Sequence, residues 1–163
     1  IIAYYEQIPD EKKDQEPLLS SKSKIENFLK KFPDSDYSLD LKFKLDLIKN
    51  QLAAKEMYVA KYYIKTKKWI PAINRLKNIL ENYETTIFVE EALFRLVELN
   101  YSLGLFEESK KYASLLGYNY NSSEWFELSY KILNKNYELE LKKVSDKEEK
   151  NNVLQKIMKN ILN

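Results

Sequence analysis

The sequence predicts an all-α fold, a short solenoid of helix–turn–helix units with one long central helix. Its 163 residues include only two glycines and four prolines, far too few for the many tight turns of a strand-rich protein. Leu, Lys, Glu, Ile and Asn dominate the composition, and most of these residue types are favourable in helices. A short pattern that recurs along the chain predicts how the helices are arranged.

Three short stretches share this pattern: an aromatic residue, two turn-forming or polar residues, Ser or Thr, any residue, and a second aromatic residue. They are residues 32–37 (FPDSDY), 83–88 (YETTIF) and 120–125 (YNSSEW). Each stretch predicts the end of one helix, a tight connection and the start of the next helix. The hydroxyl residues Ser35, Thr86 and Ser123 are the predicted N-caps, because a hydroxyl oxygen can accept an unpaired backbone N–H at a helix start.

The second and third stretches lie 37 residues apart, and the same offset relates Trp69 to Phe106 and Ala72 to Ser109. A helix–turn–helix unit of about this length is the tetratricopeptide repeat, here with a few added residues. We expect the second helix of the first unit to begin near Trp69, with Pro71 in its first turn and the small Ala72 at a close helix–helix contact. Its buried stripe would consist of Ile73, Leu76, Ile79 and Leu80.

The first and second stretches lie 51 residues apart, which is 14 residues more than the repeat. Fourteen residues make about four helical turns, so an insertion of this length keeps the same face of a helix inward. Neither proline nor glycine occurs between Tyr37 and Lys67. The sequence therefore predicts a single long helix from Asp36 to Lys67.

These patterns predict one α-solenoid domain over residues 1–163. We expect a partial first repeat over 1–35, the long helix with its partner helix over 36–83, a second complete repeat over 84–121 and C-terminal helices over 122–163.

The two ends of the chain are less regular. Residues 1–7 resemble the end of a helix, and an amphipathic helix is expected from Glu16 to Lys31. Near the C-terminus, residues 145–148 resemble a capping box. The apolar stripe of the helix that follows would cover the end of the solenoid. The chain begins at Ile1 rather than Met, so we expect a processed product or a piece of a longer protein.

Composition excludes several function classes. Without His or Cys, the chain cannot build a His or Cys zinc site, a thiol nucleophile or a Ser-His pair. No glycine-rich phosphate-binding motif occurs. We therefore expect no enzyme and no cofactor. The net charge of +2 with both signs mixed along the chain gives no case for a nucleic-acid partner, and no apolar stretch is long enough to span a bilayer.

Several stretches together resemble the BamD family, lipoprotein subunits of the bacterial outer-membrane β-barrel assembly machinery. The resemblance rests on residues 14–15 (DQ), 32–37 (FPDSDY), 51–63 (QLAAKEMYVAKYY), 69–75 (WIPAINR), 81–83 (ENY), 89–93 (VEEAL), 117–120 (GYNY) and 123–125 (SEW). It runs from about Tyr4 to Leu133, in an unbroken order of motifs that includes the long helix. It implies that this chain corresponds to the C-terminal half of such a protein. The family's lipid anchor cannot be assigned to any residue, because the chain has no Cys.

The resemblance implies a non-enzymatic adaptor at the periplasmic face of the outer membrane, lipid-anchored in its full-length form. Its partner would be the last periplasmic POTRA domain of the barrel subunit BamA, with other Bam lipoproteins as further candidates. In the family, the Arg of a Trp-x-x-x-x-Asn-Arg motif contacts that domain, and here it is Arg75. We expect Asn74, Tyr62 and Tyr63 to lie on the same surface. Without the resemblance, Arg75 would be interpreted as an ordinary exposed charge.

Two other function classes stay open at this point. A generic tetratricopeptide receptor would capture a peptide or carboxylate tail in its concave groove, and Lys, Arg and Asn side chains converging on that groove would favour it. A structural organiser of the cell envelope would assemble with itself, and a large exposed apolar patch would favour this class.

Overall fold

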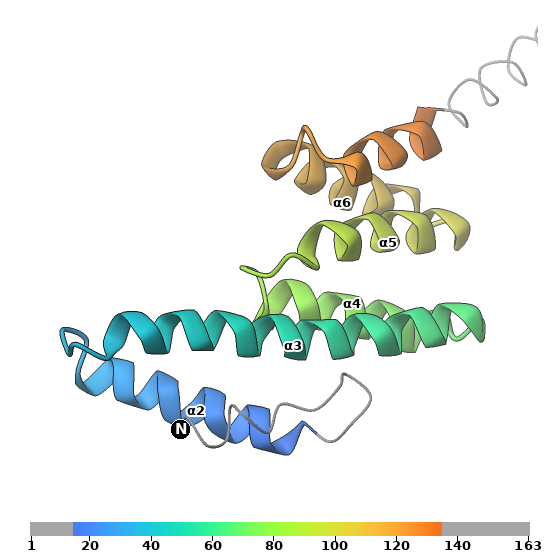
Figure 1. Ribbon diagram of the computed structural model, residues 1–163. Coiled ribbons are helices and arrows are strands. Elements are labelled where there is room, and N and C mark those ends of the chain that lie inside the picture. Colours follow the sequence, from blue (N-terminus) through green and yellow to red (C-terminus); the bar gives the residue numbers. More distant parts are fainter. Residues whose placement is uncertain (1–14, 135–163) are drawn as a thin grey trace, which may run out of the picture.

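The computed structural model describes residues 15–134, which form helices joined by turns and contain no strand in that range. The helices are α2 (Glu16–Lys31), α3 (Ser38–Lys65), α4 (Trp69–Asn82), α5 (Val89–Ser102) and α6 (Phe106–Asn119), followed by a helix over 124–134. They stack in chain order into a short solenoid (Figure 1), which confirms the predicted all-α fold. The helices expected over 1–7 and after residue 145 lie outside the described residues. The division of the chain into one domain stays a prediction.

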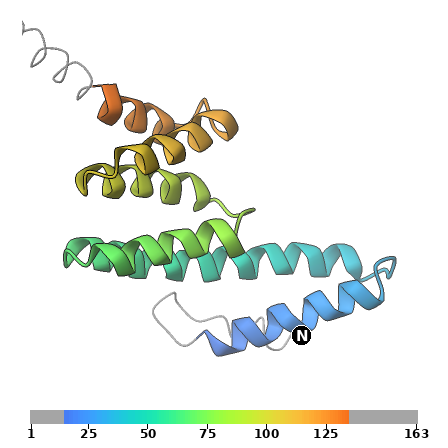
Figure 2. The same cartoon turned by 180° about the vertical axis from the view of Figure 1, so that it is seen from behind.

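The central helix α3 is twice as long as the corresponding helix of the next unit, 28 residues against 14 in α5. It begins two residues later and ends two residues earlier than predicted, so the single long helix is confirmed. Both views show α4 alongside one half of α3, while the other half projects past the stack and has α2 along it (Figures 1 and 2). The extra four turns therefore displace α2 and α4 from each other along α3.

Because α2 and α4 contact different halves of α3, the hydrophobic core is divided into two clusters. One joins α2 to the N-terminal half of α3, and the other joins the C-terminal half of α3 to α4, α5 and α6. Ala72 is fully buried in the second cluster together with Ala60 of α3, as expected for a close helix–helix contact. Of the predicted stripe, Ile73, Leu76 and Ile79 are buried and Leu80 is half-buried. Full burial of one such side chain stabilises the fold by about 1.5–3 kcal/mol.

The three connections between units have the same backbone hydrogen bonds. In each, the hydroxyl residue donates its amide to the carbonyl of the first aromatic residue, from Ser35 to Phe32 (3.4 Å), Thr86 to Tyr83 (3.1 Å) and Ser123 to Tyr120 (3.0 Å). The aromatic residue in turn donates its amide to the carbonyl four residues earlier. The aromatic residue thus ends one helix in all three places, which explains why the pattern recurs.

One of the three predicted N-caps is confirmed and two are wrong. The Ser123 hydroxyl oxygen accepts the amide of Trp125 (3.1 Å) at the start of the 124–134 helix. In contrast, α3 and α5 begin three residues beyond Ser35 and Thr86, and no side chain caps either helix. The Ser35 oxygen accepts a long hydrogen bond within its own turn (3.4 Å), and the Thr86 hydroxyl donates to the Tyr83 carbonyl (2.8 Å). An extra turn separates these two hydroxyls from the helices that follow.

The turns within the two units also correspond. After α3, Lys68 donates its amide to the carbonyl of Tyr63 (2.9 Å), and after α5, Leu105 donates to Asn100 (2.8 Å). This hydrogen bond back across the last turn is typical of a helix end with one left-handed residue. That residue is Gly104 in the second unit, with φ 77°, but Lys67 in the first, with φ 58°. A lysine therefore adopts a backbone conformation that favours glycine.

Candidate protein-binding site

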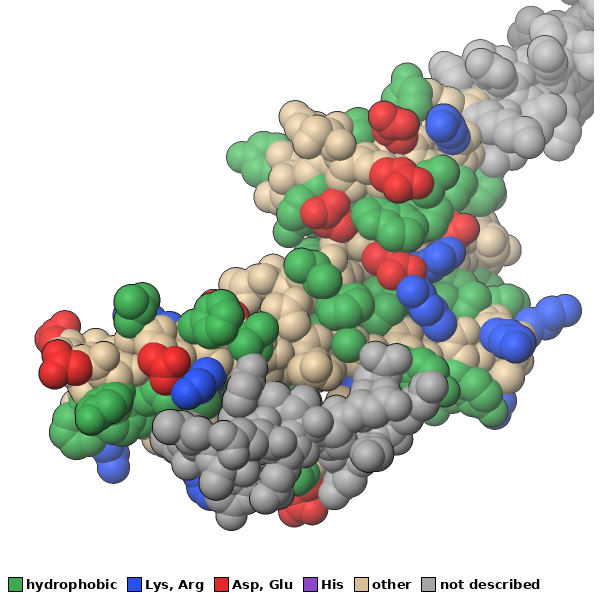
Figure 3. Space-filling view, viewed as in Figure 1, with side chains coloured by type: hydrophobic (Ala, Val, Ile, Leu, Met, Phe, Trp, Pro, Cys, Tyr) green, Lys and Arg blue, Asp and Glu red, His purple; other side chains and the backbone are tan. Residues whose placement is uncertain are grey.

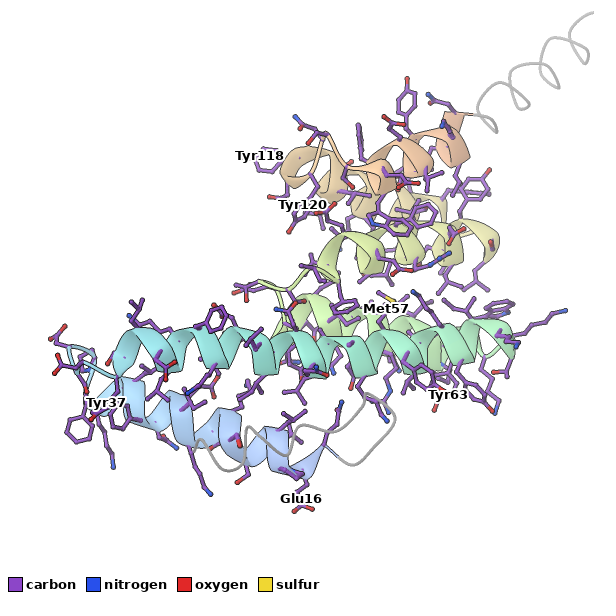
Figure 4. The ribbon with its side chains drawn as sticks, in the orientation of Figure 1. Glu16, Tyr37, Met57, Tyr63, Tyr118 and Tyr120 are labelled. Atoms are coloured by element: carbon purple, nitrogen blue, oxygen red, sulfur yellow. The ribbon has the colours of Figure 1, made fainter. Side chains whose placement is uncertain are left out.

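A hollow of about 390 Å³ lies between the C-terminal half of α3 and the first turns of α4. Most of its lining residues are polar or aromatic, and two are aliphatic: Glu56, Tyr63, Asn74, Arg75 and Asn78 belong to the first group, Ile70 and Pro71 to the second. Figure 4 shows Tyr63 projecting from α3 on the side away from α5, whereas Met57 projects between the two helices. The hollow is thus on a flank of α3 that α5 does not cover.

Comparison of α3 with α5 explains why this flank is open. The repeat of 37 residues places Glu56, Tyr62 and Tyr63 at the positions of Leu93, Leu99 and Asn100 in α5. All three α5 residues are buried, at 4–5% exposure, and α5 packs against both α4 and α6.

On α3, Tyr62 is 56% exposed, and Tyr63 and Glu56 are only partly buried. The reason is that α2 lies along the other half of α3. The inserted turns have converted a core face into a surface among the described helices.

Arg75 is paired with a carboxylate of its own chain. Its Nη1 donates to both oxygens of Glu56, at 3.1 and 3.2 Å. The Arg75 side chain is 45% exposed and that of Glu56 is 14% exposed. Nε and Nη2 of Arg75 make no hydrogen bond within residues 15–134. The expected exposed position of Arg75 is therefore observed, but one end of its guanidinium is already occupied.

The Glu56 carboxylate also influences Tyr83, the buried aromatic residue that ends α4. Burial raises the pKa of the Tyr83 hydroxyl above its ordinary value, and the negative charge of Glu56 raises that pKa further. Both effects disfavour tyrosinate, because an anion loses hydration on burial and is repelled by a second anion. The Glu56 carboxylate therefore pairs with Arg75 and also acts electrostatically on a buried phenol.

Three of the four predicted binding residues line the hollow, namely Arg75, Asn74 and Tyr63. Tyr62 is not among its lining residues, but its ring centroid lies 5.9 Å from that of Tyr63. The same α4 flank continues with Asn78, whose side-chain oxygen accepts a hydrogen bond from Asn82 (2.6 Å). The four predicted residues thus lie on one surface, and whether they bind a protein stays a prediction.

Sequence reasoning missed Glu56 and Ile70. Glu56 and Arg75 lie at nearly equal distances along the chain from Thr66, the residue that ends α3. Residues equally far from the turn of a helical hairpin face one another, so an acidic residue and a basic residue in that register could have indicated the pair. Ile70 is 66% exposed at the mouth of the hollow, where an apolar side chain has no role in the core.

The rest of the described surface is mixed. Acidic, basic and hydrophobic side chains are interspersed on the face shown in Figure 3. Exposed hydrophobic residues also occur on the projecting half of α3, including Leu39 (81%) and Phe43 (64%), and at Ile87 (80%) in the loop before α5. Near the α3–α5 contact, Glu91 pairs with both Lys61 (2.8 Å) and Arg95 (3.3 Å). These pairs are satisfied among themselves, whereas the Arg75–Glu56 pair lies in the lining of the hollow.

Residues 15–134 contain neither a metal-binding cluster nor a membrane-spanning helix. That part of the chain holds no group of three or more His, Cys, Asp or Glu residues able to bind a metal ion. Nor does it contain a helix both long enough and apolar enough to cross a membrane.

Comparison with known proteins shows similarity over most of the chain. A family model described as YfiO, outer membrane lipoprotein, matches residues 1–116. The outer membrane protein assembly factor BamD of Rickettsia prowazekii is 43% identical over 137 residues, which is 84% of this chain. The protein of the same name from Caulobacter vibrioides is 37% identical over 135 residues, or 83% of this chain. In Haemophilus influenzae the protein of that name is 36% identical over 83 residues, covering 51% of this chain and 32% of its own length.

These relatives are longer than this chain. The matched region covers 54% of the Rickettsia protein and 44% of the Caulobacter protein. The chain therefore spans about half the length of these two relatives.

Proposed function

This chain belongs to the YfiO family of outer membrane lipoproteins, and from that premise we propose that it is a non-enzymatic adaptor of the bacterial machinery that assembles outer membrane proteins. Its relatives are named as assembly factors rather than as enzymes. We propose that it acts at the periplasmic face of the outer membrane. Its partner would be the POTRA region of BamA, and the surface formed by Tyr62, Tyr63, Asn74 and Arg75 would bind it.

The observation that carries this proposal is the open flank of α3. Positions that are buried in α5 hold Tyr62 and Glu56 in α3, and an exposed tyrosine in place of a core leucine is typical of an interface. Beside it, Arg75 offers to a carboxylate two donor groups, Nε and Nη2, that make no hydrogen bond within residues 15–134. A planar guanidinium forms bidentate pairs with carboxylates, and Arg and Tyr are common among the residues that dominate binding energy.

The direct test measures binding of this chain to a purified BamA fragment that contains the POTRA domains, by titration calorimetry. An unrelated periplasmic protein serves as the negative control. Comparable binding of both proteins would contradict the proposal. With the parent chain established as a binder, Arg75→Gln tests the site. Lys77→Gln is the matched control, because Lys77 is exposed on the same helix but does not line the hollow.

We expect Arg75→Gln to weaken binding by about 30-fold or more, since truncating one partner of a buried, hydrogen-bonded charge pair costs about 2–5 kcal/mol. The Lys77→Gln variant should bind like the parent chain. Neutral substitution is preferable to charge reversal here, because Arg75→Glu would place a second carboxylate beside Glu56. Equal affinities for the Arg75→Gln and Lys77→Gln variants would remove the hollow from the interface.

A second function is supported by the asparagines. Asn74 and Asn78 lie one helical turn apart, and both line the hollow. Side-chain amides that offer a donor and an acceptor can pair with the main chain of an extended peptide. If the chain bound unstructured peptides in competition with the BamA fragment, and did so as tightly as the fragment, the peptide-receptor function would be preferred.

A further inference from the structure

Among the described residues, the Arg75 guanidinium is held at one end only. Both oxygens of Glu56 contact Nη1, at 3.1 and 3.2 Å. The Glu56 side of the ion pair is well fixed, because the Glu56 side chain is only 14% exposed and extends from the C-terminal half of α3. The two groups come from different helices, so the pair spans the hairpin. A long, flexible side chain on α4 is thereby anchored to α3.

We propose that Glu56 is a positioning residue for Arg75, which orients the guanidinium so that its Nε–Nη2 edge faces the partner. The identity of that partner rests on the function proposed above, whereas the positioning of Arg75 by Glu56 rests on the geometry of the ion pair alone. Glu56 occupies the position of the buried Leu93 in the next unit, where an apolar residue would suit the fold better than a carboxylate. A carboxylate at this position is explained by the cation that it holds.

Positioning affects affinity through the freedom that Arg75 would otherwise lose on binding. An unrestrained arginine populates several rotamers, and immobilising one long side chain at an interface weakens binding by about three- to tenfold. When Glu56 already holds Nη1, the Arg75 side chain loses most of this conformational freedom on folding, before the partner binds. The partner then meets an arginine edge whose direction is fixed, and a planar edge matches a carboxylate far better than a point charge does.

Glu56 also has an opposing effect, because its negative charge repels an acidic group on the partner. Ionic strength separates the two effects. At about 0.5 M salt the Debye length is about 4 Å, which screens the repulsion between exposed charges but leaves the restriction of the rotamers intact. The consequence of losing the positioning contact should therefore be clearest at high salt.

The binding test uses Glu56→Gln, an uncharged substitution of the same shape, with the BamA fragment as the probe. At about 0.5 M salt we expect binding to weaken about three- to tenfold in the parent chain and less than twofold in the Arg75→Gln background. Equal effects in both backgrounds would overturn the inference, because Glu56 would then act independently of Arg75. Tighter binding at both low and high salt would also overturn it and would identify Glu56 as a competitor for Arg75.

The Arg75→Lys variant provides a second line of evidence that keeps a cation beside Glu56. A lysine carries the charge but has no planar edge to orient, so we expect it to bind as weakly as Arg75→Gln. Parent-like affinity for Arg75→Lys would show that charge alone suffices and would overturn the positioning role.

A readout without any partner separates this inference from the proposed function. The chain contains only two arginines, Arg75 and Arg95, so the Nε–H region of its ¹⁵N spectrum should hold two signals. We expect Glu56→Gln to lower the order parameter of Arg75 Nε and to leave Arg95, which pairs with Glu91 and Glu98, unchanged. The converse control, Glu98→Gln, should affect only Arg95. An unchanged order parameter at Arg75 would overturn the inference even if the BamA fragment binds, whereas a lowered one would support it even if the fragment does not.

Discussion

Lys67 departs from the repeat in residue type but not in backbone conformation. It ends the turn after α3 with φ 58°, at the position that Gly104 occupies after α5 with φ 77°. Both turns have the same hydrogen bonds, so the backbone must be left-handed at this residue in each unit. We therefore predict that Lys67→Gly stabilises the protein and that Gly104→Ala destabilises it.

The magnitudes follow from two opposing contributions. A residue with a Cβ in the left-handed region costs about 1–2 kcal/mol, and replacing it by glycine removes this cost. Glycine in turn increases the entropy of the unfolded chain, which is worth about 0.4–1 kcal/mol against folding. The Lys67 side chain is exposed, and no hydrogen bond or ion pair is observed for it within residues 15–134. Lys67→Gly should then stabilise the fold by about 0.5–1 kcal/mol.

Gly104→Ala should have the opposite sign and a similar size. A Cβ added at Gly104 would meet no atom within 4 Å, so the penalty comes from backbone conformation alone. This pair of substitutions thus isolates one physical effect at two equivalent turns.

Urea unfolding followed by circular dichroism measures both changes, and an unchanged m-value would show that the unfolded state is comparable. Lys68→Gly is the matched control: Lys68 is the next residue, is also exposed, and has φ −95°. Because no strain is relieved there, Lys68→Gly should be neutral or destabilising. A Lys67→Gly variant no more stable than Lys68→Gly would refute the argument that Lys67 is strained.

Three other predictions concern the helices and the buried phenol. Ala72→Leu should destabilise the fold by about 1–3 kcal/mol through overpacking, since Ala72 is fully buried; unfolding identical to the parent would contradict the close contact of α3 and α4. Leu52→Pro should be about 3 kcal/mol more destabilising than Leu52→Ala because it breaks α3 in its middle, and equal effects would argue against a continuous helix.

Stability should fall as the pH rises above about 10, because the raised pKa of Tyr83 means that the unfolded chain releases this proton first. Tyr83→Phe should reduce that fall in stability. Urea unfolding of the parent and of the variant at pH values on both sides of 10 measures it, and an equal fall in both proteins would contradict the prediction.

The sequence predicted the helices well because the signals that end them are local. An aromatic residue followed by a Ser or Thr three residues later marks each connection between units, and the positions of these stretches fixed α3 to within two residues at each end. The N-cap predictions at Ser35 and Thr86 were wrong for a reason that the pattern does not contain. One extra turn of backbone lies between each of these two residues and the helix that follows, and the three stretches are too similar in sequence to predict where that turn occurs.

The candidate site was harder to predict because its central contact is not local. Arg75 is paired with Glu56 across a helical hairpin, and no local sequence motif in either helix predicts its partner residue in the other helix. The repeat alignment still contains the necessary information once the helix lengths are known. It relates Glu56 and Tyr62 to Leu93 and Leu99, and a charged residue and an exposed ring in place of two buried leucines identify a face that has left the core.

The long helix and the candidate site are therefore one feature. In a regular solenoid each first helix is covered on both sides by the second helices of its own and the preceding unit, as α5 is by α6 and α4. Four added turns move α2 away from the C-terminal half of α3, so that half lies against α4 but not against α2. Among the described residues, the Tyr62 ring is then exposed, and the Glu56 side chain, which is 14% exposed, pairs with Arg75. An insertion in the middle of a helix thus opens a surface that the unmodified repeat would bury, beside a paired arginine on α4.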